Sequence, residues 1–170
     1  MKYITCLILA CLVSGCANRS VPDYSAVPAG VAEEAKPVWV MLDAAHKADI
    51  DLLLSACTSE KASEVKRAPS GDLFKELLAV IPKGGLTVTE LSVSRSLDEV
   101  SAVLGIPAGG KNLVARPGFA WVLIGNKTGL PVTEHDGIWL VEANLKNPKG
   151  NWIEQVAAPL PSEGAPSDGR

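Results

Sequence analysis

Seven consecutive apolar residues, Phe119–Gly125, set the tightest limit on how this chain can fold. A strand with one face in water shows polar side chains at alternate positions, whereas a strand buried on both faces is apolar throughout. We therefore expect residues 119–125 to form a strand in a sheet that is covered on both faces.

Turn signals around that strand predict an antiparallel sheet in the second half of the chain. Asp136-Gly137 is a hairpin signal, and it precedes residues 138–145, in which alternate side chains are apolar. Asn147-Pro148-Lys149-Gly150 is typical of a type I turn and leads into a last strand over 152–156. The side chains of 138–145 that we expect on one buried face are Trp139, Val141, Ala143 and Leu145.

The first half of the chain predicts helices, because its apolar residues recur at helical spacing. Pro37 suits the first position of one helix, and Asp49 suits the N-cap of a second. Thr58-Ser59-Glu60 then predicts a short polar turn, and Ser70 caps a third helix over 70–81. The apolar faces expected on the three helices are Val38, Met41, Leu42 and Ala45; Ile50, Leu53, Leu54 and Cys57; and Leu73, Leu77, Leu78 and Ile81.

Residues 96–106 fit two structures. Ser96-Leu97-Asp98-Glu99 is a capping-box pattern that predicts a helix, yet Val100, Ala102 and Leu104 also alternate as in a strand. We favour a strand, because it would form a hairpin with residues 86–95, whereas a helix would isolate that segment. Within 86–95 the apolar phase changes near Thr89-Glu90, which predicts a bulge or sharp bend.

Helices followed by a bent antiparallel sheet define an α+β fold. The layout resembles the nuclear-transport-factor-like (cystatin-like α+β) families of small bacterial lipoproteins. Leu42–Asp51 with Leu53-Leu54, Trp139-Leu140-Val141 and Gly150–Glu154 carry this resemblance. The Gly-rich stretch 105–117 is longer than a simple hairpin requires, which leaves the strand order open.

The resemblance implies a cone whose helices pack on the bent sheet. In a half-open cone, some tryptophan side chains would line an apolar cavity for a small ligand. Packing in the core or along a pocket is the default role that we expect for each of them. The tryptophans are Trp39, Trp121, Trp139 and Trp152.

The N-terminus carries an export signal. Lys2 precedes the apolar run Tyr3–Val13, which is shorter than the ~18 residues that span a bilayer. The run ends in Leu12-Val13-Ser14-Gly15-Cys16, which resembles the lipobox of bacterial lipoproteins. That resemblance implies cleavage before Cys16, a diacylglyceride on its thiol and usually a further acyl chain such as palmitate on its amine, so that lipid on Cys16 holds the protein on a membrane. An ordinary secretory signal is the alternative.

These patterns divide the chain into four parts: a lipoprotein signal peptide (1–15), a flexible tether (16–35), one α+β domain (36–158) and a disordered tail (159–170). The tether and the tail lack helical or strand periodicity. Ala17 stands where an Asp would indicate retention in the inner membrane. The lipoprotein resemblance therefore implies the outer membrane, facing the periplasm, for a source with two membranes.

Charge and cysteine content exclude several classes of function. The net charge is −3, the isoelectric point is about 5.4 and no run of Lys or Arg occurs, so we expect no nucleic-acid partner. Cys6 and Cys11 leave with the signal and Cys16 is acylated, so that Cys57 is the remaining free thiol. We expect it to be a small buried hydrophobe.

The best candidate for acid/base chemistry is the pair Asp43 and His46. They lie three residues apart on one helical face, although an exposed helix surface is the commoner interpretation of such a pair. His135 stands between Glu134 and Asp136 before a turn, where we expect it to be solvated. Neither histidine has a second His or Cys at ligand spacing, so we predict no metal site.

Gly105–Asn112 nearly matches a phosphate-binding loop. Asn112 replaces the Ser or Thr that would hold magnesium, and Pro117 and Gly118 prevent the helix that should follow. We expect a flexible loop and no cofactor.

The leading hypothesis is a non-catalytic, membrane-anchored periplasmic module that binds a small apolar ligand or an envelope protein. One alternative is a cone-fold enzyme that uses Asp43 and His46 as acid and base. Another is a structural envelope or secretion-assembly lipoprotein.

Overall fold

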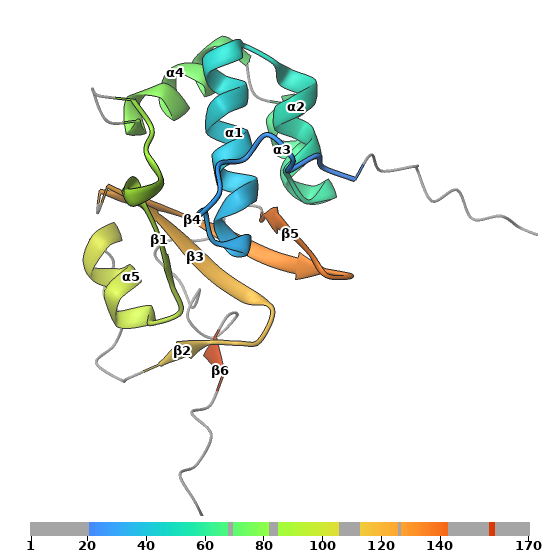
Figure 1. Cartoon of the computed structure of the whole chain (residues 1–170). Coiled ribbons are helices and arrows are strands. Elements are labelled where there is room, and N and C mark those ends of the chain that lie inside the picture. Colours follow the sequence, from blue (N-terminus) through green and yellow to red (C-terminus); the bar gives the residue numbers. More distant parts are fainter. Residues whose placement is uncertain are drawn as a thin grey trace, which may run out of the picture.

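The computed structural model describes residues 21–67, 70–81, 85–105, 113–125, 127–142 and 157–158 (Figure 1). These residues form an α+β fold, as expected. The helices are η1 (Glu33–Ala35), α1 (Lys36–Lys47), α2 (Ile50–Ser55), α3 (Ser59–Arg67), α4 (Ser70–Val80), η2 (Val88–Glu90) and α5 (Leu97–Leu104). The strands are β1 (Leu91–Ser94), β2 (Val114–Ala115), β3 (Phe119–Ile124), β4 (Thr128–His135), β5 (Ile138–Val141) and β6 (Ala157–Ala158).

Four strands form an antiparallel sheet in the order β1-β3-β4-β5. Strand β3 lies inside it, with Val122 opposite Val93 on one side and Leu130 on the other. Strands β2 and β6 pair separately as a short two-stranded sheet. Strands β3, β4 and β5 therefore form a meander, and β1 lies beside β3. The sequence had left this strand order open.

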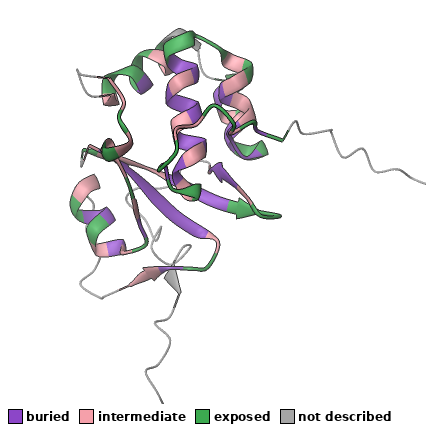
Figure 2. Ribbon diagram, in the orientation of Figure 1, coloured by how far each residue is buried: buried purple, intermediate pink, exposed green. Residues whose placement is uncertain are grey.

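Strand β3 is covered on both faces, which confirms the expectation for its apolar run. All six of its residues are buried, and Figure 2 shows the strand buried along its length. Ala120, Val122 and Ile124 belong to the main core, which also holds the buried side chains of α1. Phe119, Trp121 and Leu123 face the other way into a second core with Leu97 and Val100 of α5. Alternate side chains of one strand thus supply both cores.

Helix α1 begins next to Pro37, as predicted. Pro37 stands in its first turn, where a missing N–H costs nothing. The helix ends at Ala48, which adopts a left-handed conformation with φ of 52°. The four side chains predicted to face inward are all buried: Val38, Met41, Leu42 and Ala45.

The second helix is confirmed, but the polar turn after it is wrong. The Asp49 side chain accepts a hydrogen bond from the Leu52 N–H (3.0 Å) and so caps α2 as predicted. The next three residues, Thr58-Ser59-Glu60, open helix α3 instead of a turn. The Thr58 hydroxyl accepts the Lys61 N–H (3.2 Å), an N-cap that supports this further helix.

Helix α4 occupies the predicted span but buries less of its apolar face. Leu77 is buried, and Leu73 packs against the main core. Leu78 was expected to point inward, yet its exposed fraction is 39%. Phe74, Val80 and Ile81 also pack against the main core, and Leu78 lies at the edge of this packed face.

Helix α5 occupies residues 97–104, so the strand predicted in this segment is wrong. The Ser96 side chain accepts the Glu99 N–H (3.3 Å), and Gly105 ends α5 with φ of 65°. The helix does not isolate the segment before it, because β1 pairs with β3 rather than with residues 96–106. The helical spacing of Leu97 and Val100 lets α5 cover the second face of the sheet.

Of the bulge or sharp bend predicted near Thr89-Glu90, the structure has the bend. The chain makes the 3₁₀ turn η2 there, and β1 begins directly after it. Leu91 and Val93 then point toward the main core. The change in apolar phase thus marks a turn that precedes the strand.

The hairpin between β4 and β5 is confirmed. Asp136 and Gly137 both have positive φ, 52° and 79°, as a two-residue type I′ turn requires. Trp139 and Val141 are buried in the main core, as predicted. Ala143, Leu145, the turn at 147–150 and the strand at 152–156 lie outside the described residues.

Much of the segment assigned to the tether packs on the domain. We call residues 22–35 the N-terminal arm. Pro22 is buried, and Val31 and Ala35 belong to the main core. The Tyr24 hydroxyl donates a hydrogen bond to the Trp139 carbonyl oxygen (2.5 Å). The domain therefore begins near residue 22 instead of residue 36.

The arm also contains a local turn at Asp23. Its carboxylate accepts the Ser25 N–H (2.9 Å), and this bond holds the pKa of the Asp23 carboxyl below its ordinary value of 3.8. Side chains of this type stabilise turns by bonding to their own backbone two residues on. The signal peptide, Cys16 and the tail at 159–170 lie outside the described residues.

Candidate functional site

The two residues of the acid/base candidate lie on α1 in different surroundings. Asp43 is half-buried, and its carboxylate accepts a hydrogen bond from Lys47 Nζ (2.6 Å). His46 is exposed in the last turn of the helix. We predicted that the Asp43 carboxylate acts together with His46, but it binds Lys47 instead. An acid and a lysine four residues apart commonly stabilise a helix surface in this way.

The second histidine lies at a hairpin. His135 is the last residue of β4 and is exposed, as are its neighbours Glu134 and Asp136. The position matches the solvated turn that the sequence predicts.

The tryptophans have mainly a packing role in the described residues. Trp121 lies in the second core with its ring 6.4 Å from that of Phe119 in an edge-on arrangement. Trp139 lies in the main core, and Trp39 is half-buried against it. Trp152 lies outside the described residues.

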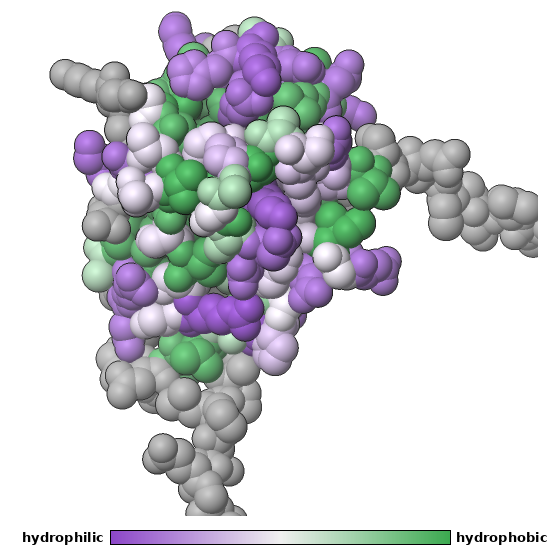
Figure 3. Space-filling model, in the orientation of Figure 1, coloured by the Kyte–Doolittle hydropathy of each residue, from purple (hydrophilic) through white to green (hydrophobic). Residues whose placement is uncertain are grey.

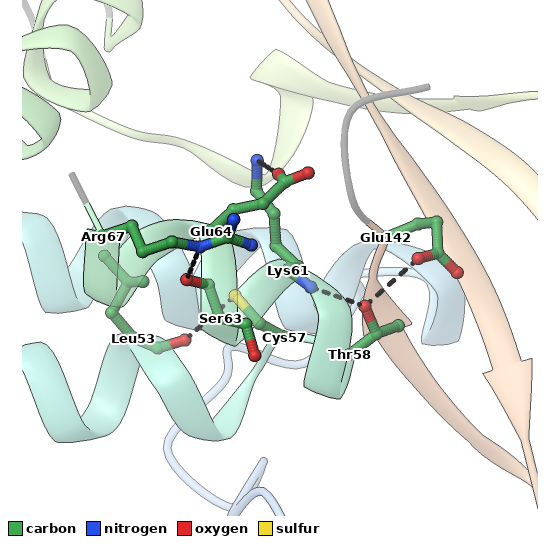
Figure 4. A network of polar contacts seen from close by, with 8 residues as sticks. All are labelled: Leu53, Cys57, Thr58, Lys61, Ser63, Glu64, Arg67 and Glu142. Atoms are coloured by element: carbon green, nitrogen blue, oxygen red, sulfur yellow. Dashed lines mark hydrogen bonds and ion pairs between the residues drawn. The ribbon is translucent and has the colours of Figure 1, made fainter. Parts of the chain in front are cut away.

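A polar network that the sequence analysis missed joins α3 to the end of β5 (Figure 4). The Thr58 hydroxyl donates to Glu142 Oε1 (3.1 Å) while it accepts the Lys61 N–H. The Thr58 N–H donates to the Val141 carbonyl (2.8 Å), and the Val141 N–H donates to the Ala56 carbonyl (2.8 Å). The segment before α3 therefore covers the outer edge of β5 with backbone hydrogen bonds.

Lys61 places a charge in this network. The residue is buried, and its Nζ lies 3.5 Å from Glu64 Oε2, one helical turn away. A charge withdrawn from water is costly unless a partner lies near it, and a lysine stem can pack on apolar neighbours while its ammonium reaches a carboxylate. This ion pair lies within α3, and the contacts of Thr58 with Val141 and Glu142 are what join α3 to the sheet. In the sequence, the one local sign of this network is Thr58, which stands three residues before Lys61 as an N-cap does. Glu142 lies 84 positions away from Thr58 and could not be connected with it from the sequence.

Partly exposed apolar side chains form a second candidate feature, on α4, η2 and β1. Leu78 is the more prominent, while Phe74, Val88 and Leu91 pack against the main core with part of their surface in water. Figure 3 shows hydrophobic surface on this side of the molecule, between α1 and the segment that holds η2 and β1. Apolar side chains that keep part of their surface in water can contribute to a site for a ligand or partner.

Cys57 is buried, as predicted. Its thiol donates a hydrogen bond to the Leu53 carbonyl (3.3 Å), within the turn that links α2 to α3. The lipidation candidate, Cys16, and residues 106–112 of the near phosphate loop lie outside the described residues. Gly105, the first residue of that motif, is the left-handed residue that ends α5.

No group of three or more His, Cys, Asp or Glu side chains among the described residues is arranged to hold a metal ion. None of the helices in this part of the chain has the length and apolar content needed to cross a membrane.

Comparison with known proteins gives no relative. The chain matches no family model, no curated protein and no solved structure.

Proposed function

We propose that this chain is a lipid-anchored envelope protein whose α+β domain binds a ligand or partner without catalysing a reaction. The observation that carries the proposal is the sequence Leu12–Cys16 at the end of an apolar run of signal-peptide length. Lipid on Cys16 attaches the protein to a membrane, and Ala17 favours the outer membrane, facing the periplasm, in a cell with two membranes.

The binding part of the proposal rests on the apolar surface of α4, η2 and β1. Leu78 and the half-buried side chains beside it offer a place for an apolar ligand or an envelope protein. The enzyme alternative has less support, because Asp43 is bonded to Lys47 and His46 is exposed. No observation on the described residues favours the structural or secretion-assembly alternative.

A nuclear-transport-factor-like cone is the finer fold that we propose. It is supported by the packing of α1 across one face of a sheet that runs as a meander from β3 to β5. Helix α5, inserted between β1 and the meander, departs from a simple order of helices followed by strands.

Metabolic labelling with a palmitate analogue tests the anchor. We expect label on the wild-type chain and none on Cys16→Ser, because the thiol is the acceptor of the diacylglyceride. Cys57→Ser is the matched control and should keep the label, since Cys57 is buried in the domain. Equal labelling of wild type and Cys16→Ser would contradict the proposal.

A further inference from the structure

The N-terminal arm joins the domain only a few residues after the proposed anchor. Pro22 is buried, Tyr24 is bonded to the Trp139 carbonyl, and Val31 is in the main core. Five residues, Ala17–Val21, therefore separate Cys16 from the first buried residue of the domain. The sequence alone indicated a tether that continued to residue 35.

This spacing limits how far the domain can move from its anchor. An extended chain reaches at most ~3.6 Å per residue, so Pro22 lies within about 22 Å of Cys16 in any conformation. A domain of this size has a radius of gyration of about 14 Å and is therefore about 36 Å across. The tether is shorter than the domain is wide, so the domain cannot turn every side toward the surface that holds the lipid.

We propose that the side of the domain around Val21 faces the lipid bilayer at close range and that helix α5 faces away from it. The inference rests on the proposed lipid anchor at Cys16. The described chain begins on one side of the molecule and α5 lies on the other (Figure 1). Val21 itself is 69% exposed, so the chain presents an apolar side chain where it meets the domain.

The attached lipid supplies the affinity, and the short tether supplies the orientation. A domain drawn to lipid headgroups by charge would carry a basic patch, and its approach would weaken as salt rises. The orientation proposed here depends on chain length, so it should not change with salt. The outward side then presents α5 and the second face of the sheet to the periplasm.

Fluorescence quenching on vesicles tests the orientation. Single labels are placed at Ser25→Cys on the arm and at Ala102→Cys on α5, both exposed positions, in a Cys57→Ala background. The full lipidated chain is reconstituted into vesicles of phosphatidylethanolamine and phosphatidylglycerol that contain a quencher on the headgroup. We expect quenching at Ser25 to exceed that at Ala102 by about twofold or more, at low and at high salt, because the tether keeps the arm near the surface.

A variant with a longer tether is the control. Insertion of about twenty Gly and Ser residues between Ser20 and Val21 lets the domain rotate, so the difference between the two labels should disappear. Flotation of the vesicles is measured first. A chain that does not float with them contradicts the lipid anchor.

Among chains that do float, three results would overturn the orientation alone. These are equal quenching at the two positions with the native tether, stronger quenching at Ala102, and self-quenching of the Ser25 label that rises with protein density. The last result would indicate that a second copy of the chain covers this side.

Discussion

Single residues at helix ends show where this fold carries local strain. Helix α1 ends at Ala48 and helix α5 ends at Gly105, and both residues have left-handed backbone conformations. Glycine adopts this conformation without a steric penalty, whereas a side chain with a Cβ is strained in it by roughly 1–2 kcal/mol. Ala48 is therefore a position at which a stabilising substitution is available.

Replacing Ala48 with glycine should raise the free energy of unfolding by about 0.5–1 kcal/mol, because relief of strain exceeds the added entropy of the unfolded chain. The control is Ala102→Gly, the same change at an exposed position inside α5, which should lower it by about 1 kcal/mol. Urea unfolding of a chain beginning at Val21 measures both values. Equal losses in the two variants would contradict the left-handed end of α1.

At the scale of elements, Thr58 links a helix to a strand. Its side chain caps α3 and reaches Glu142, while its backbone N–H bonds to Val141. These contacts close the outer edge of β5, which would otherwise present unpaired backbone groups. Helix α3 and the sheet should consequently lose stability together when this residue is changed.

Thr58→Ala should lower the free energy of unfolding by about 1–2 kcal/mol, since it removes the N-cap of α3 and a bond to Glu142. Thr58→Ser keeps the hydroxyl and should retain most of the stability. Thermal unfolding compares the two variants. A serine variant as unstable as the alanine variant would show that the hydroxyl does not stabilise this junction.

Strands β4 and β5 provide a second test at this scale. Trp139 is buried in the main core, and its partner across the hairpin, Glu134, is exposed. Trp139→Ala should cost about 3–5 kcal/mol, while Glu134→Ala should change stability by no more than about 0.5 kcal/mol. Similar unfolding midpoints for the two variants would contradict the burial of Trp139 in the main core.

The elements predicted well are those whose pattern allows one structure. Strand β3 is apolar throughout, whereas a strand with one face in water carries polar side chains at alternate positions. Residues 97–104 match helix and strand alike, and only the need to cover the second face of the sheet decides between them.

The Thr58–Glu142 contact was missed because its residues are 84 positions apart and neither carries a local signal for the other. Asp43 and His46 were placed correctly on one helix, but spacing does not reveal that Lys47 binds the carboxylate.

At the scale of the whole molecule, the main difference from the sequence analysis is the start of the domain. The arm has few large apolar residues and no periodicity, and the Tyr24 hydroxyl bonds to a residue 115 positions away. Such contacts depend on the finished fold and cannot be inferred from local pattern. They add an N-terminal segment to the main core and shorten the link to the proposed anchor.

Removal of the arm should destabilise the domain. A chain beginning at Val21 should unfold as the mature domain does, whereas a chain beginning at Lys36 should lose about 3 kcal/mol or more, because Tyr24, Val31 and Ala35 no longer bury apolar surface. Thermal melts of the two chains measure the difference. Equal melting temperatures would contradict the packed arm and restore the longer tether.

The chemical state of the mature N-terminus tests the lipid anchor most directly. Intact-mass analysis of the chain purified from membranes should find Cys16 as the first residue, with a diacylglyceride on its thiol and an acyl chain on its amine. A mature chain that begins at another residue, or one that begins at an unmodified Cys16, would contradict the proposal.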